Sequence, residues 1–231
     1  MIERRPFAGL GGADHGWLKA KHHFSFASYY DPARMGWGNL RVWNDDEIAA
    51  KAGFPPHPHA DMEIITYVRD GAITHQDSMG NVGRTEAGDV QVMSAGSGVR
   101  HSEYNEENGT TRIFQILIQP TTHGGTPSWG ARPFPKAERS GRFVTLASGF
   151  AEDDALPIRA DARVMGATVK AGERVMLALG PKRHAYLVPA TGAVDVGGVR
   201  IEARDGTAIT DLANIEIVRI EDADVVLVDA A

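Results

Sequence analysis

Short apolar segments rich in β-branched side chains recur along the whole chain. The segments are 40–43, 63–68, 90–93, 113–118, 143–146, 164–169, 174–179, 185–188, 193–196, 215–220 and 225–228. Turn-forming sequences such as Arg69-Asp70-Gly71, Glu86-Ala87-Gly88-Asp89 and Gly197-Gly198 lie between many of them. Short strands at such close spacing are typical of a β-sandwich or a β-barrel. The pattern therefore predicts an all-β protein.

The clearest helix candidate lies in the N-terminal half. Asp45, Asp46 and Glu47 place acidic side chains where the first turn of a helix would be, and Gly53 would end it. The sequence thus predicts one short helix over residues 45–53, in a fold that has few short helices.

The apolar pattern stops between residues 119 and 139, where several glycines and prolines would interrupt any ladder of backbone hydrogen bonds. We therefore expect one domain at 1–122, a linker at 123–139 and a second domain at 140–231.

The two halves of the chain resemble weak copies of one another. Gly71, which follows an apolar run, aligns with Gly192, and the segment around Gly88 aligns with the segment around Gly206. The first pair is 121 residues apart and the second is 118 residues apart. A repeat this faint supports two barrels of one type rather than establishing them.

Composition and charge exclude several classes of function. The chain carries 24 Lys and Arg against 30 Asp and Glu, a net charge of −6, so no overall field attracts nucleic acid or an anionic membrane. It has no cysteine, which excludes disulfides, thiolate ligands and a cysteine nucleophile. No apolar run approaches the roughly 20 residues of a membrane helix, and no apolar stretch follows the N-terminal charges as in a secretory signal. We expect a cytoplasmic protein.

Candidate metal ligands alternate along one segment after a pair of prolines. His57, His59, Asp61 and Glu63 occupy every second position, and in a single strand such side chains share one face. The two histidines also lie in a proline-rich stretch, where exposed and merely solvated imidazoles are the alternative.

A second pair of candidate ligands, His101 and Glu103, lies some forty residues further on with the same spacing. Two such pairs on neighbouring strands of a barrel can converge on one point. Three imidazoles and a carboxylate are a suitable ligand set for a divalent first-row transition metal. The sequence therefore predicts a metal site.

Three motifs in order resemble the pirin family of the cupin superfamily, and most closely the bacterial pirin-like proteins with quercetin 2,3-dioxygenase activity. The motifs are His57-Pro58-His59-x-Asp61-Met62-Glu63, His75-Gln76-Asp77-Ser78-Met79-Gly80-Asn81 and Met93-Ser94-Ala95-Gly96-x-Gly98-x-x-His101-Ser102-Glu103. The resemblance covers nearly the whole chain and is strongest up to Gln119. It implies two tandem cupin-type barrels of the double-stranded β-helix, or jelly-roll, type.

The resemblance also implies the identity of the ligands. In pirins they match His57, His59, His101 and Glu103, whereas most other cupins take their carboxylate from the first motif, which here is Glu63. The pirin form of the second motif favours Glu103, and Glu63 then supports the ligands from behind or supports the fold.

The activity implied by the resemblance is a metal-dependent dioxygenase that cleaves quercetin or another aromatic enol with dioxygen. Glu103 would combine the roles of ligand and catalytic base. The expected cofactor is one divalent ion per chain, with Fe(II) as first choice and Cu, Ni, Mn or Zn as alternatives. The competing hypothesis is a metal-containing regulatory module that binds a protein partner.

Applied to the ligand positions, the repeat offsets point to Ala178, Gly180, Arg219 and Glu221 in the second half. These residues lack imidazoles, so we expect the second barrel to be free of metal, with Arg219 in its interior.

Three other histidines are ambiguous at this level. His75 shares a face with Asp77 and lies either at the cavity mouth or in a polar pair beside a turn. His22 and His23 precede an aromatic cluster, which is more often a lid or the interface of a core than a ligand platform.

Overall fold

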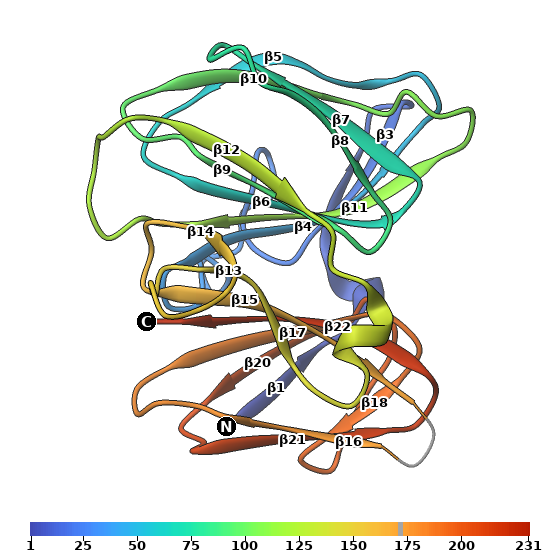
Figure 1. Cartoon of the computed structure of the whole chain (residues 1–231). Helices are drawn as coiled ribbons and strands as arrows, with labels where there is room; N and C mark the ends of the chain where they lie inside the picture. The colour runs from blue at the N-terminus through green and yellow to red at the C-terminus, as the bar shows by residue number, and fades with distance from the viewer. Residues whose placement is uncertain (171–172) are drawn as a thin grey trace.

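The computed structural model describes residues 1–170 and 173–231, which form two β-barrels stacked on one another (Figure 1). A seven-stranded and a four-stranded sheet make up each barrel. The prediction of an all-β fold with two barrels is confirmed. Within the described residues, helical structure is limited to two short 3-10 turns, η1 (Phe7–Gly9) and η2 (Lys136–Arg139), and no helix is long and apolar enough to cross a membrane.

The first barrel contains the candidate ligands. In spatial order, its large sheet consists of β12 (Ser128–Arg132), β9 (Val90–Ser94), β6 (Glu63–Asp70), β11 (Thr111–Ile118), β4 (Leu40–Ile48), β3 (Leu18–His22) and β2 (Gly11–Asp14). Its small sheet consists of β5 (Gly53–His59), β10 (Val99–Tyr104), β7 (Ala72–Asp77) and β8 (Val82–Glu86).

The second barrel repeats most of this strand order and differs at one edge of its large sheet. Its large sheet consists of β1 (Ile2–Arg5), β20 (Gly206–Thr210), β17 (His184–Thr191), β22 (Ala223–Ala230), β15 (Ala162–Val169), β13 (Val144–Ser148) and β14 (Leu156–Pro157). Its small sheet consists of β16 (Arg174–Ala178), β21 (Asn214–Arg219), β18 (Val194–Val196) and β19 (Val199–Ile201). The faint repeat in the sequence therefore corresponds to a repeated topology.

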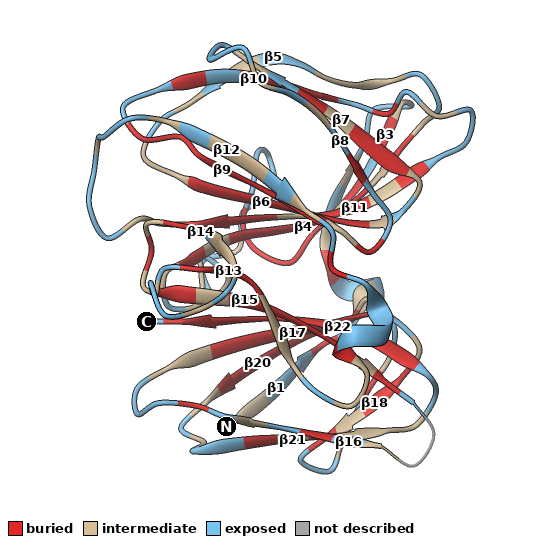
Figure 2. Cartoon of the chain, in the orientation of Figure 1, coloured by how far each residue is buried: buried red, intermediate tan, exposed pale blue. Residues whose placement is uncertain are grey.

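The two large sheets face each other and share one core. Phe114 and Ile116 of β11 belong to this core together with Val226 and Val228 of β22, and the central strands of both sheets, such as β11 and β22, are largely buried (Figure 2). The alternate side chains of the same strands, such as Ile113, point into the barrel and form separate clusters. Because both faces of these strands are buried, their sequences are nearly continuous apolar runs.

The predicted helix over residues 45–53 is wrong, because residues up to Ile48 belong to β4 in the middle of the large sheet. Two of the acidic side chains that suggested a helix start, Asp45 and Glu47, are charge partners within the protein. The fully buried Asp45 forms ion pairs with Arg69 and with Arg204 of the second barrel. Ion pairing satisfies a buried carboxylate inside a sheet, which local helix signals do not register.

Two segments depart from the predicted division of the chain. Within the predicted linker 123–139, β12 pairs with β9 as an edge strand of the first barrel. At the N-terminus, β1 pairs with β20 of the second barrel, at the edge position that β12 occupies in the first. The boundaries at 122 and 140 otherwise stay a prediction.

Arg5 holds β1, the N-terminal strand that pairs into the second barrel and is called the exchanged strand below, at the junction of the barrels. Its side chain is almost fully buried, and its guanidinium lies 5.5 Å from the ring centroids of Phe24 and Trp37 and 5.6 Å from that of Tyr186. A desolvated guanidinium over aromatic faces is attracted by their quadrupoles. The aromatic cluster in the sequence is thus part of the interface between the barrels.

His23 lies in the same junction, fully buried, with Nδ1 3.0 Å from the hydroxyl of Tyr186. Burial, reinforced by the charge of Arg5, lowers the pKa of His23 to about 3. The folded chain therefore keeps this imidazole neutral.

We predict that acid weakens the protein through His23. Its ordinary pKa is 6.5, so below that pH the unfolded chain binds a proton that the folded chain does not take up until about pH 3. The free energy of unfolding should fall as pH decreases through this window, by up to about 1.4 kcal/mol per pH unit for this one group. Urea unfolding between pH 7 and 4 should show a shallower fall in His23→Gln than in wild type. The exposed His15→Gln is the control, and equal slopes in all three proteins would contradict the prediction.

Candidate metal centre

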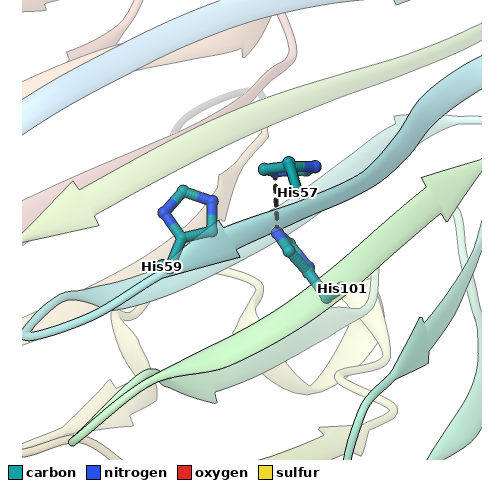
Figure 3. Close-up of side chains that lie close together, drawn as sticks. All are labelled: His57, His59 and His101. Atoms are coloured by element: carbon teal, nitrogen blue, oxygen red, sulfur yellow. Dashed lines mark hydrogen bonds between the residues drawn. The ribbon is translucent and has the colours of Figure 1, made fainter.

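Three histidines converge where β5 and β10 pair. The strands are antiparallel, and their register places His57 directly opposite His101, with His59 opposite Val99. One ring nitrogen from each of His57, His59 and His101 lies within 4.8 Å of the others (Figure 3). We call these three residues the histidine triad. The sequence predicts all three as metal ligands, and the structure brings them together.

The local sequence explains why β5 can present its histidines in this way. β5 is an edge strand of the small sheet and contains Pro55, Pro56 and Pro58, which lack the N–H that a central strand would need. Asp61 then adopts a left-handed conformation with φ of 50°, and the chain crosses to the large sheet. The expected shared face of His57 through Glu63 is therefore wrong, because Glu63 begins β6 in that other sheet.

His57 has the tautomer that a metal ligand needs. Nδ1 of His57 lies 2.8 Å from the carbonyl oxygen of Pro55 and donates a hydrogen bond to it, so Nε2 keeps its lone pair. Nε2 of His101 lies 3.0 Å from this atom. Two nitrogens at right angles on one ion, each bound at ~2.1 Å, would be about 3.0 Å apart. The residues therefore fit a transition metal.

Two of the three imidazoles, those of His59 and His101, are also held neutral. Burial, followed by the charge of His57, lowers the pKa of His59 to about 4. Burial and then the neighbouring histidines lower the pKa of His101 to about 3. Metal ions bind the neutral imidazole, so protons compete weakly for these two nitrogens at neutral pH.

Glu103 lies on β10 beyond a register shift that separates it from His101, and it is not a member of the triad's close group. Its carboxylate is buried and accepts three hydrogen bonds. Thr66 Oγ1 and Gln91 Nε2 donate to Oε1 at 2.8 and 2.6 Å, and Gln115 Nε2 donates to Oε2 at 3.0 Å. A carboxylate offers about four lone-pair sites, so about one remains, on Oε2. Its role as a fourth ligand stays a prediction.

The donors to Glu103 belong to a polar row that the sequence analysis missed. His22, Asn44, Gln115, Thr66 and Gln91 are register partners across β3, β4, β11, β6 and β9. They lie between two apolar clusters of the barrel interior. The local signal is a polar residue at an inward position of each strand, such as Gln115 in an otherwise apolar run.

His57 and His59 of the triad line a cavity of about 320 Å³. Its lining includes the apolar side chains of Leu18, Phe26, Phe54 and Leu117, and the polar side chains of His22, Asn44, Asp46, His57, His59, Glu103 and Gln115. Burial and then the charge of Asp45 raise the pKa of Asp46 well above its ordinary value. The mixture of apolar walls and convergent polar groups is typical of a small-molecule site.

Glu63, the alternative carboxylate, has other partners. Its side chain is buried and accepts a hydrogen bond from Ser94 on the neighbouring strand. Burial raises its pKa, and the hydrogen bond from Ser94 opposes that shift. Glu63 does not line the cavity or belong to the triad's close group among the described residues.

The second barrel has apolar side chains at the positions of the triad. β16 and β21 take the places of β5 and β10 in this barrel, and their inward side chains are Val175, Leu177, Ile215 and Ile217. All four pack in or against the core of that barrel. The offsets that gave Ala178 and Gly180 are therefore wrong, because the hairpins differ in length between the two halves, and both residues are exposed.

Arg219 lies at the end of β21, opposite Val194 of β18. We expected it inside the second barrel. It instead forms an ion pair with Asp222, at 2.7 Å, and its side chain is 30% exposed.

Fold and site together define a two-barrel cupin protein with a candidate metal site in its first barrel. A family model described as Pirin matches residues 4–118, and one described as the quercetinase C-terminal cupin domain matches 145–230. A pirin-like protein of Caulobacter vibrioides is 73% identical over the full length of both chains. A quercetin 2,3-dioxygenase of Escherichia coli is 42% identical over 99% of this chain and 98% of its own.

Solved structures agree with these matches. Bacterial pirin YhhW from Escherichia coli, in complex with nickel(II), superposes with a TM-score of 0.94 at 40% identity, covering 100% of this chain and 99% of that one. The chain belongs to the pirin family. The expected likeness to quercetin 2,3-dioxygenases is confirmed.

We predict one metal ion per chain, bound by the triad. His59→Ala should reduce metal content to less than about a tenth of an equivalent and leave the barrel folded, because the ligands project from strands that have their own core. Elemental analysis and circular dichroism check this, with the exposed His123→Ala as control. The double variant His57→Ala/His59→Ala should hold no metal, because Val175, Leu177 and Ile217 offer no donor atom in the second barrel. A retained equivalent in either triad variant would contradict the assignment.

Proposed function

We propose that this protein is a metal-dependent dioxygenase that cleaves quercetin, or a related flavonol or aromatic enol, with dioxygen. The observation that carries the proposal is the histidine triad beside a cavity of mixed apolar and polar lining, with Glu103 among the lining residues. The cavity volume lies at the lower end of the roughly 300–1,000 Å³ of small-molecule sites. A relative that bears the name quercetin 2,3-dioxygenase supports the substrate class.

The ligand set we propose is His57, His59, His101 and Glu103. The nickel complex of the related bacterial pirin supports one divalent transition metal. Fe(II) is our first choice, and Cu, Ni, Mn or Zn suit the same ligands. When bound, such an ion supplies Lewis-acid stabilisation of a substrate enolate and a binding position for dioxygen.

The chain's own residues bind the substrate and handle its proton. Apolar side chains such as Phe54 and Leu117 would hold a flat aromatic ring and exclude water from the site. Glu103 is the catalytic base that accepts the enol proton, at Oε2, because Thr66 and Gln91 already occupy Oε1. With one free lone-pair site, Glu103 serves as ligand and as base in turn rather than at once. A cytoplasmic location belongs to the same proposal.

We predict that Glu103, and not Glu63, is the critical acid. Glu103→Gln replaces an acceptor oxygen by an NH₂ group among three donors, so metal should bind more weakly and turnover should fall about 10²-fold or more. Glu63→Gln should keep its metal, because Glu63 contacts Ser94 rather than the triad.

The measurement is oxygen uptake with quercetin by metal-reconstituted protein, together with elemental analysis of each variant. Full activity in Glu103→Gln combined with metal loss in Glu63→Gln would reverse the assignment. Wild-type protein that holds its metal but consumes no dioxygen with quercetin or other flavonols would refute the proposed activity itself.

A further inference from the structure

His75 is a buried histidine behind the triad, not at the cavity mouth. It lies on β7, the strand that pairs with β10 on the side opposite β5. Its ring is stacked on the indole of Trp129, with centroids 4.9 Å apart and planes within 8° of parallel. Its centroid lies 5.4 Å from that of His101. Contacts with both rings limit the orientations that His75 can adopt.

Asp77 sets the tautomer of His75. The Oδ1 atom of Asp77 accepts hydrogen bonds from the backbone N–H groups of Met79 and Asn81, and Oδ2 accepts one from the side chain of Asn81. The same Oδ2 lies 3.1 Å from Nε2 of His75. A carboxylate held so firmly favours a proton on Nε2, so Nδ1 of His75 is left as an acceptor.

His101 needs a hydrogen-bond acceptor beside its Nδ1 if it is to bind metal. If its Nε2, which faces Nε2 of His57 at 3.0 Å, is to bind metal, the neutral ring must carry its proton on Nδ1. Among the described residues, Nδ1 of His101 and Nδ1 of His75 are both buried and neither has a hydrogen-bond partner. One is then a donor and the other an acceptor, on rings that are neighbours. Buried donors and acceptors are almost always matched in folded proteins.

We propose that His75 and Asp77 are a positioning pair for the metal centre, in which Nδ1 of His75 accepts the hydrogen bond of the His101 ring and Asp77 fixes His75 for that role. A small rotation of either ring, or one bridging water, connects the two nitrogens at this ring separation. The pair would hold Nε2 of His101 toward the triad and raise its strength as a ligand. The inference rests on the metal centre of the proposed function, and not on the identity of the substrate.

The test is the affinity for Ni²⁺, measured by competition with a chelator. His75→Phe keeps an aromatic ring beside Trp129 but removes the acceptor, and should weaken Ni²⁺ binding about 10- to 100-fold, the usual effect of losing a hydrogen bond behind a histidine ligand. Asp77→Asn should weaken it by a smaller factor. His75→Gln, which restores an acceptor oxygen, should recover part of the loss. The exposed Gln76→Ala on the same strand is the control.

A spectroscopic readout separates positioning from a structural role. The visible absorption spectrum of Co²⁺-loaded protein should shift in His75→Phe and return toward the wild-type spectrum in His75→Gln. Ni²⁺ affinity within about twofold of wild type in both His75→Phe and Asp77→Asn would overturn the inference. A loss of affinity that His75→Gln does not relieve, with an unshifted Co²⁺ spectrum, would also overturn it. Because no substrate is used, either outcome leaves the dioxygenase proposal standing, whereas wild-type protein without Ni²⁺ binding would refute the metal centre.

Discussion

Polar groups inside an apolar barrel must find partners, and this constraint organises the first barrel. Its inner face has an apolar cluster on either side of one polar row. Three members of that row donate hydrogen bonds to the buried carboxylate of Glu103. An unmatched donor in such a place costs about 1–3 kcal/mol. The arrangement therefore holds Glu103 in one orientation before any ligand binds, which is what a preorganised site requires.

The second barrel has the same topology with an apolar interior in place of the histidine triad and the polar row. Its strands follow the same order, but apolar side chains such as Val175, Leu177 and Ile217 lie on the strands that correspond to the histidine-bearing β5 and β10. Those side chains close the interior with the core of the barrel. The interior of the second barrel is thus completed by apolar packing. In the first barrel, the triad and the polar row occupy space that apolar packing would otherwise fill.

The junction between the barrels makes the two halves depend on one another. The large sheets share a core, β1 crosses from the start of the chain to the second barrel, and Arg204 of the second barrel pairs with Asp45 of the first. Asp45 is next to Asp46, which lines the cavity from the same strand. The floor of the candidate site is therefore a sheet whose outer face is covered by the second barrel. The large sheet of the first barrel therefore contributes both to the stability of the junction and to the geometry of the site.

The sequence by itself determined the all-β class and the candidate ligands of the triad, because apolar runs between turns and candidate ligands two residues apart follow directly from the geometry of a strand. Two barrels were indicated by the faint repeat and by the resemblance to pirins. The sequence failed where a residue's role depends on a distant partner. Asp45 resembles a helix start in the sequence, whereas in the structure it pairs with arginines. Glu63 has the spacing of a residue that shares a face with His59, but the turn at Asp61 places the two on different strands. The polar row, the exchanged β1 and the place of His75 were decided by tertiary structure alone. They arise from strand register between segments far apart in the chain, and no local pattern encodes register.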